Sequence, residues 1–206
     1  MRRPEGSIIV VSAPSGAGKT TLIRRLRASM PELAFSISYT TRARRVGERN
    51  GREYFFIKPE EFRRLAQRGA FAEWAQVHAD LYGTPLAPLE AARRAGRDIL
   101  LDIDVQGYAR LKRRFPEAAG IFIVPPSRRE LERRLKGRHQ DRPEAIHRRL
   151  EDARREIAQW KNYDYVVMND DLREAARALR AIVTAIRHRA AARGRQMNHI
   201  LRNFGG

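Results

Sequence analysis

The residues best placed to do chemistry form a small-residue loop near the N-terminus, between an apolar run and a helical stretch. The β-branched run 7–12 predicts a buried strand, and a helix is expected from Lys19 to about Ser29, before Pro31. The junction nearly matches the pattern G-x-x-x-x-G-K-[ST], with alanine at the first glycine position; its residues are Ala13, Pro14, Ser15, Gly16, Ala17, Gly18, Lys19 and Thr20. Because such a loop turns backbone N–H groups and a helix N-terminus toward phosphate oxygens, the sequence indicates a nucleoside triphosphate site.

Two side chains of this loop have expected roles of their own. In loops of this kind the lysine contacts the β- and γ-phosphates and the next hydroxyl faces Mg²⁺, which predicts these roles for Lys19 and Thr20. We expect Thr21 to complete the ATP-binding set, with Mg²⁺ as the cofactor that accompanies ATP. A glycine-rich turn without a ligand is the alternative, and Gly-Lys-Thr directly after a buried strand argues against it.

Two carboxylates end a second apolar run, at 98–104. Asp102 and Asp104 are two residues apart, so on a strand they share a face. In a parallel sheet, ligands bind beyond the carboxyl ends of the strands, where the phosphate-binding loop also lies. We therefore expect the pair to serve Mg²⁺ or a second substrate, with a solvated strand end as the alternative.

The order of elements indicates the fold class. Apolar runs at 7–12, 98–104, 121–124 and 165–168 alternate with helical stretches, which predicts a parallel, doubly wound α/β sheet with buried strands. A capping box at Ser127-x-x-Glu130 opens one helix, Asp141-x-x-Glu144 another, and a long C-terminal helix is expected over 172–193. The hairpin-like stretch 38–86, with strands at 35–39, 54–57 and 71–84, reads as an insertion on the core segments 1–37, 87–126 and 151–206.

Composition limits the function classes. The chain has 206 residues and no cysteine, which excludes disulfides, thiolate metal sites and a cysteine nucleophile and favours the cytoplasm. No apolar run approaches the ~20 residues of a membrane span. Lys and Arg outnumber Asp and Glu by 42 to 24, and the net charge of +18 favours polyanionic or phosphorylated partners. Nonspecific nucleic-acid binding and a homo-oligomer held by the basic C-terminal tail are open alternatives.

Several further motifs carry a family resemblance. Residues 38–48 read S-x-T-T-R-x-x-R-x-G-E, and Glu73-Trp74-Ala75, Tyr82-Gly83-Thr84 and the acidic strand end follow in order. With the phosphate-binding loop they resemble guanylate kinase over essentially the whole chain. The resemblance implies a P-loop three-layer α/β fold: a central mostly parallel sheet, a small mixed-β GMP-binding insertion at 38–86 and a helical lid at 127–150. It implies transfer of the γ-phosphoryl group of ATP to GMP, with dGMP as a further candidate.

The resemblance also assigns residues to GMP. It implies that the GMP phosphate is held by Arg42, Arg45, Tyr54 and Tyr82, and the guanine by Ser38, Glu73, Thr84 and Asp104. Arginine suits a phosphate because its planar fork donates two hydrogen bonds at once. A carboxylate suits guanine because it can accept both N1–H and N2–H, whereas adenine would leave it unpaired.

The phosphoryl-transfer groups come from the same resemblance. It implies catalytic roles for Lys19, Arg42, Arg134, Arg138 and Arg149, an adenine-edge role for Asn169, and Mg²⁺ bound by Thr20 and, through water, by Asp102. No general base is needed, because catalysis of this transfer is positioning and charge neutralisation. The chain departs from the pattern at three positions: Arg44 replaces a proline, Leu81 a tyrosine and His139 a glycine.

Two other functions stay open at this point. A sugar-phosphate kinase, such as a ribose 1,5-bisphosphate phosphokinase, shares the P-loop but has no need of Ser38, Glu73 and Thr84. A non-catalytic guanylate kinase-like binding module would have no need of Gly18-Lys19-Thr20. Trp74 is expected to be core packing.

Overall fold

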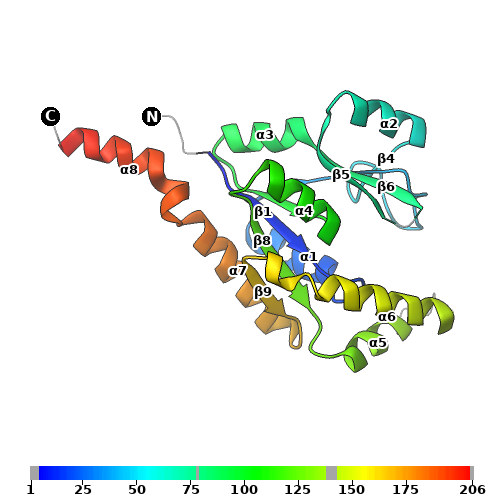
Figure 1. Cartoon of the computed structure of the whole chain (residues 1–206). Coiled ribbons are helices and arrows are strands. Elements are labelled where there is room, and N and C mark those ends of the chain that lie inside the picture. Colours follow the sequence, from blue (N-terminus) through cyan, green and yellow to red (C-terminus); the bar gives the residue numbers. More distant parts are fainter. Residues whose placement is uncertain (1–4, 78, 138–142, 205–206) are drawn as a thin grey trace.

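The computed structural model describes residues 5–77, 79–137 and 143–204 and contains two sheets (Figure 1). The larger has five parallel strands in the order β2-β7-β1-β8-β9; their bounds are β1 (Ile8–Ser12), β2 (Ala34–Ser36), β7 (Ile99–Asp102), β8 (Ala119–Val124) and β9 (Tyr165–Met168). The parallel α/β core predicted from the alternating runs is confirmed.

Helices cover both faces of this sheet, which explains the continuous apolar runs. They are α1 (Lys19–Ser29), α3 (Leu86–Arg94), α4 (Val105–Arg114) and α7 (Leu172–Arg187). Along β1, Ile9 and Val11 pack with α1 and α7, whereas Ile8 and Val10 pack with α3 and α4. Successive residues of β1 thus enter opposite cores, and a polar residue at either position would be buried.

The stretch 38–86 forms the second sheet, as expected for an insertion. Its strand order is β4-β3-β6-β5, and the elements are β3 (Tyr39–Thr40), β4 (Phe55–Phe56), α2 (Pro59–Gln67), β5 (Phe71–Val77) and β6 (Asp80–Pro85). The sheet is mixed: β3 pairs with β4 in parallel and with β6 antiparallel. Phe62 of α2 stacks on Phe71 of β5 with ring centroids 4.6 Å apart, and this contact packs the helix on the sheet.

Two helices follow strand β8 of the larger sheet and share a small core of their own. They are α5 (Arg128–Lys136) and α6 (Pro143–Ile157), joined by the buried side chains Leu131, Leu135, Ile146, Leu150 and Ala153. The Ser127 hydroxyl accepts a hydrogen bond from the Glu130 N–H at 3.1 Å, which confirms this cap. The cap at Asp141 and the site residue Arg138 lie outside the described residues, as does His139.

Several predictions about the elements are wrong in detail. The strand expected over 35–39 is split between β2 and β3, and β7 ends at Asp102 because Asp104 caps α4 instead. Trp74 is 43% exposed because it points away from the core on edge strand β5. Strand β9 is not fully buried: Val166 is 45% exposed, since β9 forms one edge of the five-stranded sheet.

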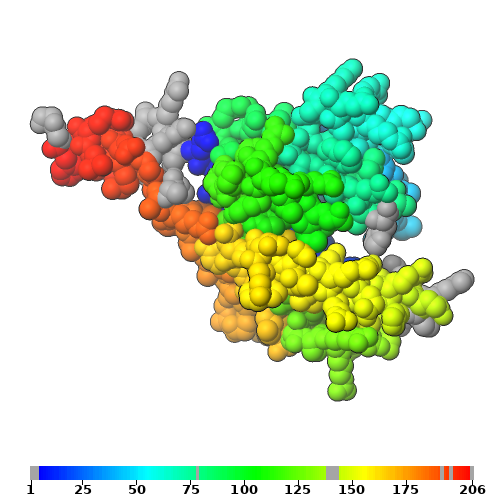
Figure 2. All heavy atoms as spheres, in the orientation of Figure 1, coloured from blue at the N-terminus to red at the C-terminus, as the bar shows by residue number. Residues whose placement is uncertain are grey.

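The C-terminal helix is also interrupted. Helix α7 ends at Arg187, and α8 (Ala190–Phe204) follows and projects from the body (Figures 1 and 2). The basic residues at the break contact the core rather than only solvent: Arg187 pairs with Asp98 at 2.7 Å and Arg189 donates to the Tyr165 hydroxyl at 2.7 Å. No helix within the described residues combines the length and apolar character that a membrane span requires.

Substitution of Gly120 by alanine is expected to destabilise the core. A Cβ at Gly120 would lie 2.3 Å from the buried Tyr108 ring, which stacks on Tyr163. Overpacking of this kind lowers the free energy of unfolding by roughly 1–3 kcal/mol. Urea denaturation of Gly120→Ala measures it, with Gly194→Ala as the control, since a Cβ there meets nothing within 4 Å. Equal unfolding midpoints for Gly120→Ala and the parent chain would contradict the packing described.

Candidate active site

The pairing of β1 with β7 places the loop lysine beside a carboxylate. In the parallel register Val11 lies opposite Asp102, so both strands end at the same edge of the sheet. There the Lys19 ammonium and the Asp102 carboxylate form an ion pair, Nζ to Oδ1 2.5 Å. Burial lowers the pKa of Lys19, but Asp102 more than offsets this and the net pKa is raised. Lys19 is therefore held charged in the cleft.

The phosphate-binding loop has the backbone that its glycines predict. Gly16 and Gly18 adopt φ of 91° and 93°, a region that other residues rarely adopt. The Asn169 side chain, at the end of β9, donates to the Ala17 carbonyl at 2.7 Å, and a Cβ at Gly18 would lie 2.3 Å from its amide nitrogen. Asn169 thus packs directly against the loop, at the position where the sequence predicts an adenine contact.

Two of the four predicted catalytic arginines, Arg134 of α5 and Arg149 of α6, reach the same loop. Arg149 donates to the Ser15 hydroxyl at 2.7 Å. Arg134 donates to the Asn169 carbonyl at 2.8 Å and forms an ion pair with Glu130 at 2.7 Å. Both guanidinium groups therefore lie beside the predicted triphosphate site and are held by protein atoms.

The sequence analysis missed one residue of this region, Glu156 of α6. Its carboxylate accepts a hydrogen bond from the Ser15 N–H, and burial raises its pKa to about 7 although Lys19 lowers it. The available signal was spacing: Glu156 is seven residues after Arg149, so both lie on one face of the helix.

The predicted phosphate-binding groups gather on the second sheet. Arg42 forms an ion pair with Glu48 at 2.7 Å, and its guanidinium carbon lies 5.6 Å from the centre of the Tyr54 ring. The rings of Tyr54 and Tyr82 are 5.8 Å apart. Burial raises the pKa of Tyr54, and Asp102 raises it further, so this hydroxyl lies near the Lys19 ion pair. Arg45 has an exposed side chain at the rim of the group, as has the divergent Arg44.

The second sheet also carries a buried carboxylate, on strand β5. Glu73 on β5 is 7% exposed, and its Oε1 accepts a hydrogen bond from the Thr84 hydroxyl of β6 at 2.6 Å. Burial raises the pKa of Glu73 to about 7; Thr84 and Arg110 lower it, while Asp104 raises it. The hydroxyl proton of Thr84 is thus engaged by Glu73, so in this structure Thr84 positions the carboxylate. Ser38 is buried in the same sheet.

Glu73 also lies against the first turn of α4. A Cβ on Gly107 would come within 2.9 Å of Glu73 Oε2 and 3.1 Å of Asp104 Oδ1, so a side chain there would displace these carboxylates. Asp104 accepts a hydrogen bond from the Gly107 N–H at 2.8 Å and is thereby fixed at the start of the helix. The start of α4 therefore lies between Glu73 of the second sheet and the end of β7, where Asp102 pairs with Lys19.

The donor set fits a magnesium ion that is held mainly by phosphates and water. Within the described residues, no three Asp, Glu or His side chains converge as a cation cage. Thr20 opens α1 and Asp102 ends β7, which supplies one hydroxyl and one carboxylate near Lys19. Magnesium sites at nucleotides commonly use one or two protein oxygens in this way.

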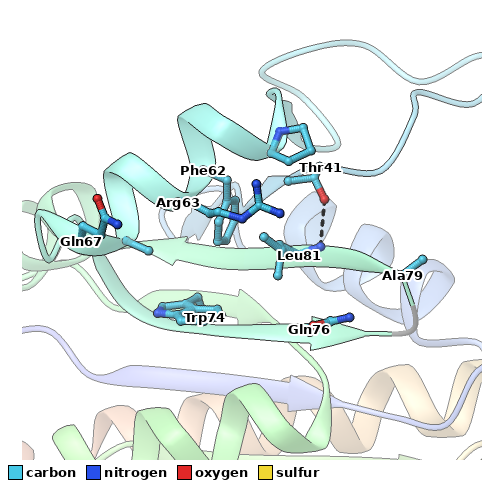
Figure 3. A pocket seen from close by; sticks show the side chains of 10 residues that line it. Thr41, Phe62, Arg63, Gln67, Trp74, Gln76, Ala79 and Leu81 are labelled. Carbon is cyan, nitrogen blue, oxygen red and sulfur yellow. Dashed lines mark hydrogen bonds between the residues drawn. The ribbon is translucent and has the colours of Figure 1, made fainter.

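A separate hollow lies behind the second sheet (Figure 3). It has a volume of about 560 Å³ and lies between α2 and the β5–β6 hairpin, with Phe62, Trp74, Gln76 and Leu81 among its lining residues. Side chains alternate along a strand, so Trp74 and Leu81 face away from Glu73 and Tyr82. The hollow is therefore on the opposite face of this sheet from the candidate site.

The comparisons with known proteins agree with this arrangement. The family model described as guanylate kinase matches residues 5–186. The chain is 53% identical to a guanylate kinase of Syntrophotalea carbinolica over 180 residues, 87% of this chain and 86% of the relative. It is 47% identical to one of Chromobacterium violaceum over 205 residues, 100% and 98% of the two chains. The crystal structure of guanylate kinase from Anaplasma phagocytophilum superimposes with a TM-score of 0.77 at 36% identity, covering 92% of this chain and 90% of that one.

The pKa of Glu73 is expected to depend on its hydrogen bond with Thr84. Removal of the hydroxyl in Thr84→Val leaves the buried carboxylate with one donor fewer, so its pKa should rise above the value of about 7. Carbon NMR of the labelled glutamate side chains in the ligand-free protein measures this. Thr84→Ser keeps the donor and serves as the control; a pKa unchanged by the valine would contradict the contact.

Proposed function

The chain belongs to the guanylate kinase family, the ATP:GMP phosphotransferases, and we propose that ATP and GMP meet in the cleft between its P-loop and its second sheet. One observation carries this assignment. Lys19 pairs with Asp102 at the end of β7, and two residues later Asp104 lies beside Glu73 at the first turn of α4, so the cation proposed for the triphosphate and the carboxylate proposed for guanine both lie at this end of β7.

ATP is assigned to the P-loop side. The loop residues 13–18 would offer backbone N–H groups to the phosphates, Lys19 would exchange Asp102 for the β- and γ-oxygens, and Thr21 would complete the set. Asn169 would lie at the adenine edge, already packed on Ala17. This mode of binding depends on the positive charge of Lys19, which its ion pair with Asp102 stabilises.

Thr20 and Asp102 are assigned to Mg²⁺, with Asp102 acting through water. When bound, the ion would neutralise charge on the β- and γ-phosphates during transfer. The Thr20 hydroxyl near the start of α1 and the Asp102 carboxylate paired with Lys19 support this role.

GMP is assigned to the second sheet. Arg42 and Arg45 with the hydroxyls of Tyr54 and Tyr82 would bind its phosphate, and the proximity of Tyr54 to Lys19 would bring that phosphate toward ATP. Guanine would donate N1–H and N2–H to Glu73, with Ser38, Thr84 and Asp104 around it. Adenine has an acceptor at N1 and would leave the buried carboxylate unpaired.

Transfer requires positioning and charge rather than a general base, because the phosphate of GMP is itself the nucleophile. Arg134 and Arg149 would leave their present partners Glu130 and Ser15 for the transferring group, together with Arg42 and Lys19. We assign 127–150 as the lid that delivers them and excludes water, with Arg138 as a further member by resemblance.

The setting of the reaction stays a prediction. A cytoplasmic location, a homo-oligomer and nonspecific nucleic-acid binding were inferred from composition and charge alone.

Glu73→Gln is expected to weaken guanine recognition without affecting ATP. The amide can accept one hydrogen bond where the carboxylate accepts two, and its NH₂ group opposes the guanine donors. We expect kcat/KM for GMP to fall roughly 100-fold or more, mostly through KM, with KM for ATP unchanged. Steady-state kinetics measure this, with the exposed Glu61→Gln as the control. Unaltered GMP kinetics would refute the base-reading role.

The same substitution should stabilise the ligand-free protein at high pH. Folding raises the pKa of Glu73 from about 4.5 to about 7, so the fold favours the protonated carboxyl. That stabilising contribution is complete below the unfolded pKa and is lost as pH rises through 7. Glutamine is neutral at every pH, so the stability of Glu73→Gln relative to wild type should increase between pH 5 and pH 8. Urea denaturation at both values tests the sign, and a difference independent of pH would contradict it.

A further inference from the structure

We propose that Arg110 of α4 is a positioning residue for guanine recognition, which anchors edge strand β5 to α4 and keeps its own cation beside the Glu73 carboxylate. The inference rests on the proposed role of Glu73. It adds a residue outside every motif that carried the family resemblance.

The anchor is a set of contacts between α4 and β5. Strand β5 is the edge of its sheet, so its outer backbone groups have no strand partner. The Arg110 guanidinium donates to the Trp74 carbonyl, and Arg114, one turn later, donates to the Phe71 carbonyl at 3.1 Å. These two carbonyls flank Glu73 in the chain, and the register of β5 on β6 shifts between Phe71 and Glu73. Helix α4 therefore replaces the missing strand at the point where Glu73 must be fixed.

The Trp74 ring holds Arg110 in place. The guanidinium carbon lies 5.7 Å from the ring centre, and the same ring makes an edge-to-face contact with Phe62, with centroids 6.3 Å apart. A cation over an aromatic face is attracted by the ring quadrupole. The partly exposed Trp74, which the sequence suggested as core packing, thus fixes the position of a charged side chain.

The charge of Arg110 acts on a carboxylate whose ionised form is needed. Three residues and the burial of the site influence the pKa of Glu73; the residues are Thr84 of β6, Asp104 at the start of α4 and Arg110 later on α4. Arg110 is the cation among them and opposes both burial and Asp104. Its removal would favour the protonated carboxyl, which cannot accept both guanine donors.

The test compares Arg110→Met with wild type in steady-state kinetics from pH 6 to pH 9. Methionine keeps an apolar stem on Trp74 and removes the charge. We expect kcat/KM for GMP to fall roughly fivefold at pH 7, through KM, and the ratio of variant to wild type to return toward one at pH 9. The ratio cancels the ionisation of GMP itself. Arg110→Lys should restore most of the activity at pH 7, and KM for ATP should not change.

A double-mutant cycle separates this inference from the proposed function. In the Glu73→Gln background there is no charge to maintain, so Arg110→Met should have no further effect on GMP kinetics. Arg113→Met is the matched control on the same helix, with an exposed side chain. A loss that is the same at every pH, or that persists undiminished beside Glu73→Gln, would overturn the inference. If Glu73→Gln alone leaves GMP kinetics normal, the proposed function fails instead.

Discussion

The parallel pairing of β1 with β7 is the constraint on which the site depends. It brings the end of the P-loop strand opposite Asp102, and the resulting ion pair more than offsets the lowering of the Lys19 pKa by burial. The chain then turns from β7 through Asp104 into α4, whose first turn contacts Glu73. One strand register therefore brings Lys19 to the end of β7, a few residues before the helix start that contacts Glu73, and we propose that these two groups bind the two nucleotides.

The buried carboxylate of Glu73 is a compromise between stability and recognition. Burial opposes its charge, whereas the proposed hydrogen bonds from guanine need that charge. Three features oppose this penalty or make room for the carboxylate: a hydrogen bond from Thr84, a glycine at 107 beside it at the start of α4, and the positive charge of Arg110, which lowers its pKa. The same burial that weakens the ionised form makes an unpaired carboxylate costly, which is how such a site rejects the wrong base.

Sequence patterns predicted the parts whose structure is decided locally. The P-loop follows from its glycines, the Ser127 cap from its spacing, and the core strands from runs that could only be buried between helices. The errors arose where tertiary context decides. Asp104 was predicted as a strand residue because its capping hydrogen bond with Gly107 can be recognised only when the start of α4 is known. Strand β9 was predicted to be buried because an apolar run does not indicate whether its strand lies at the edge of the sheet. Glu156 and Arg110 were missed because their partners are distant in the chain.

The central claim is that the cleft pairs ATP with a guanine nucleotide, and the most direct measurement is substrate choice. One coupled assay would follow ADP formation from ATP and Mg²⁺ with GMP, AMP, CMP, UMP and ribose 1,5-bisphosphate in parallel. We expect turnover with GMP and none above background with the other four acceptors. Turnover with the sugar phosphate alone, or none with any acceptor from folded protein, would contradict it.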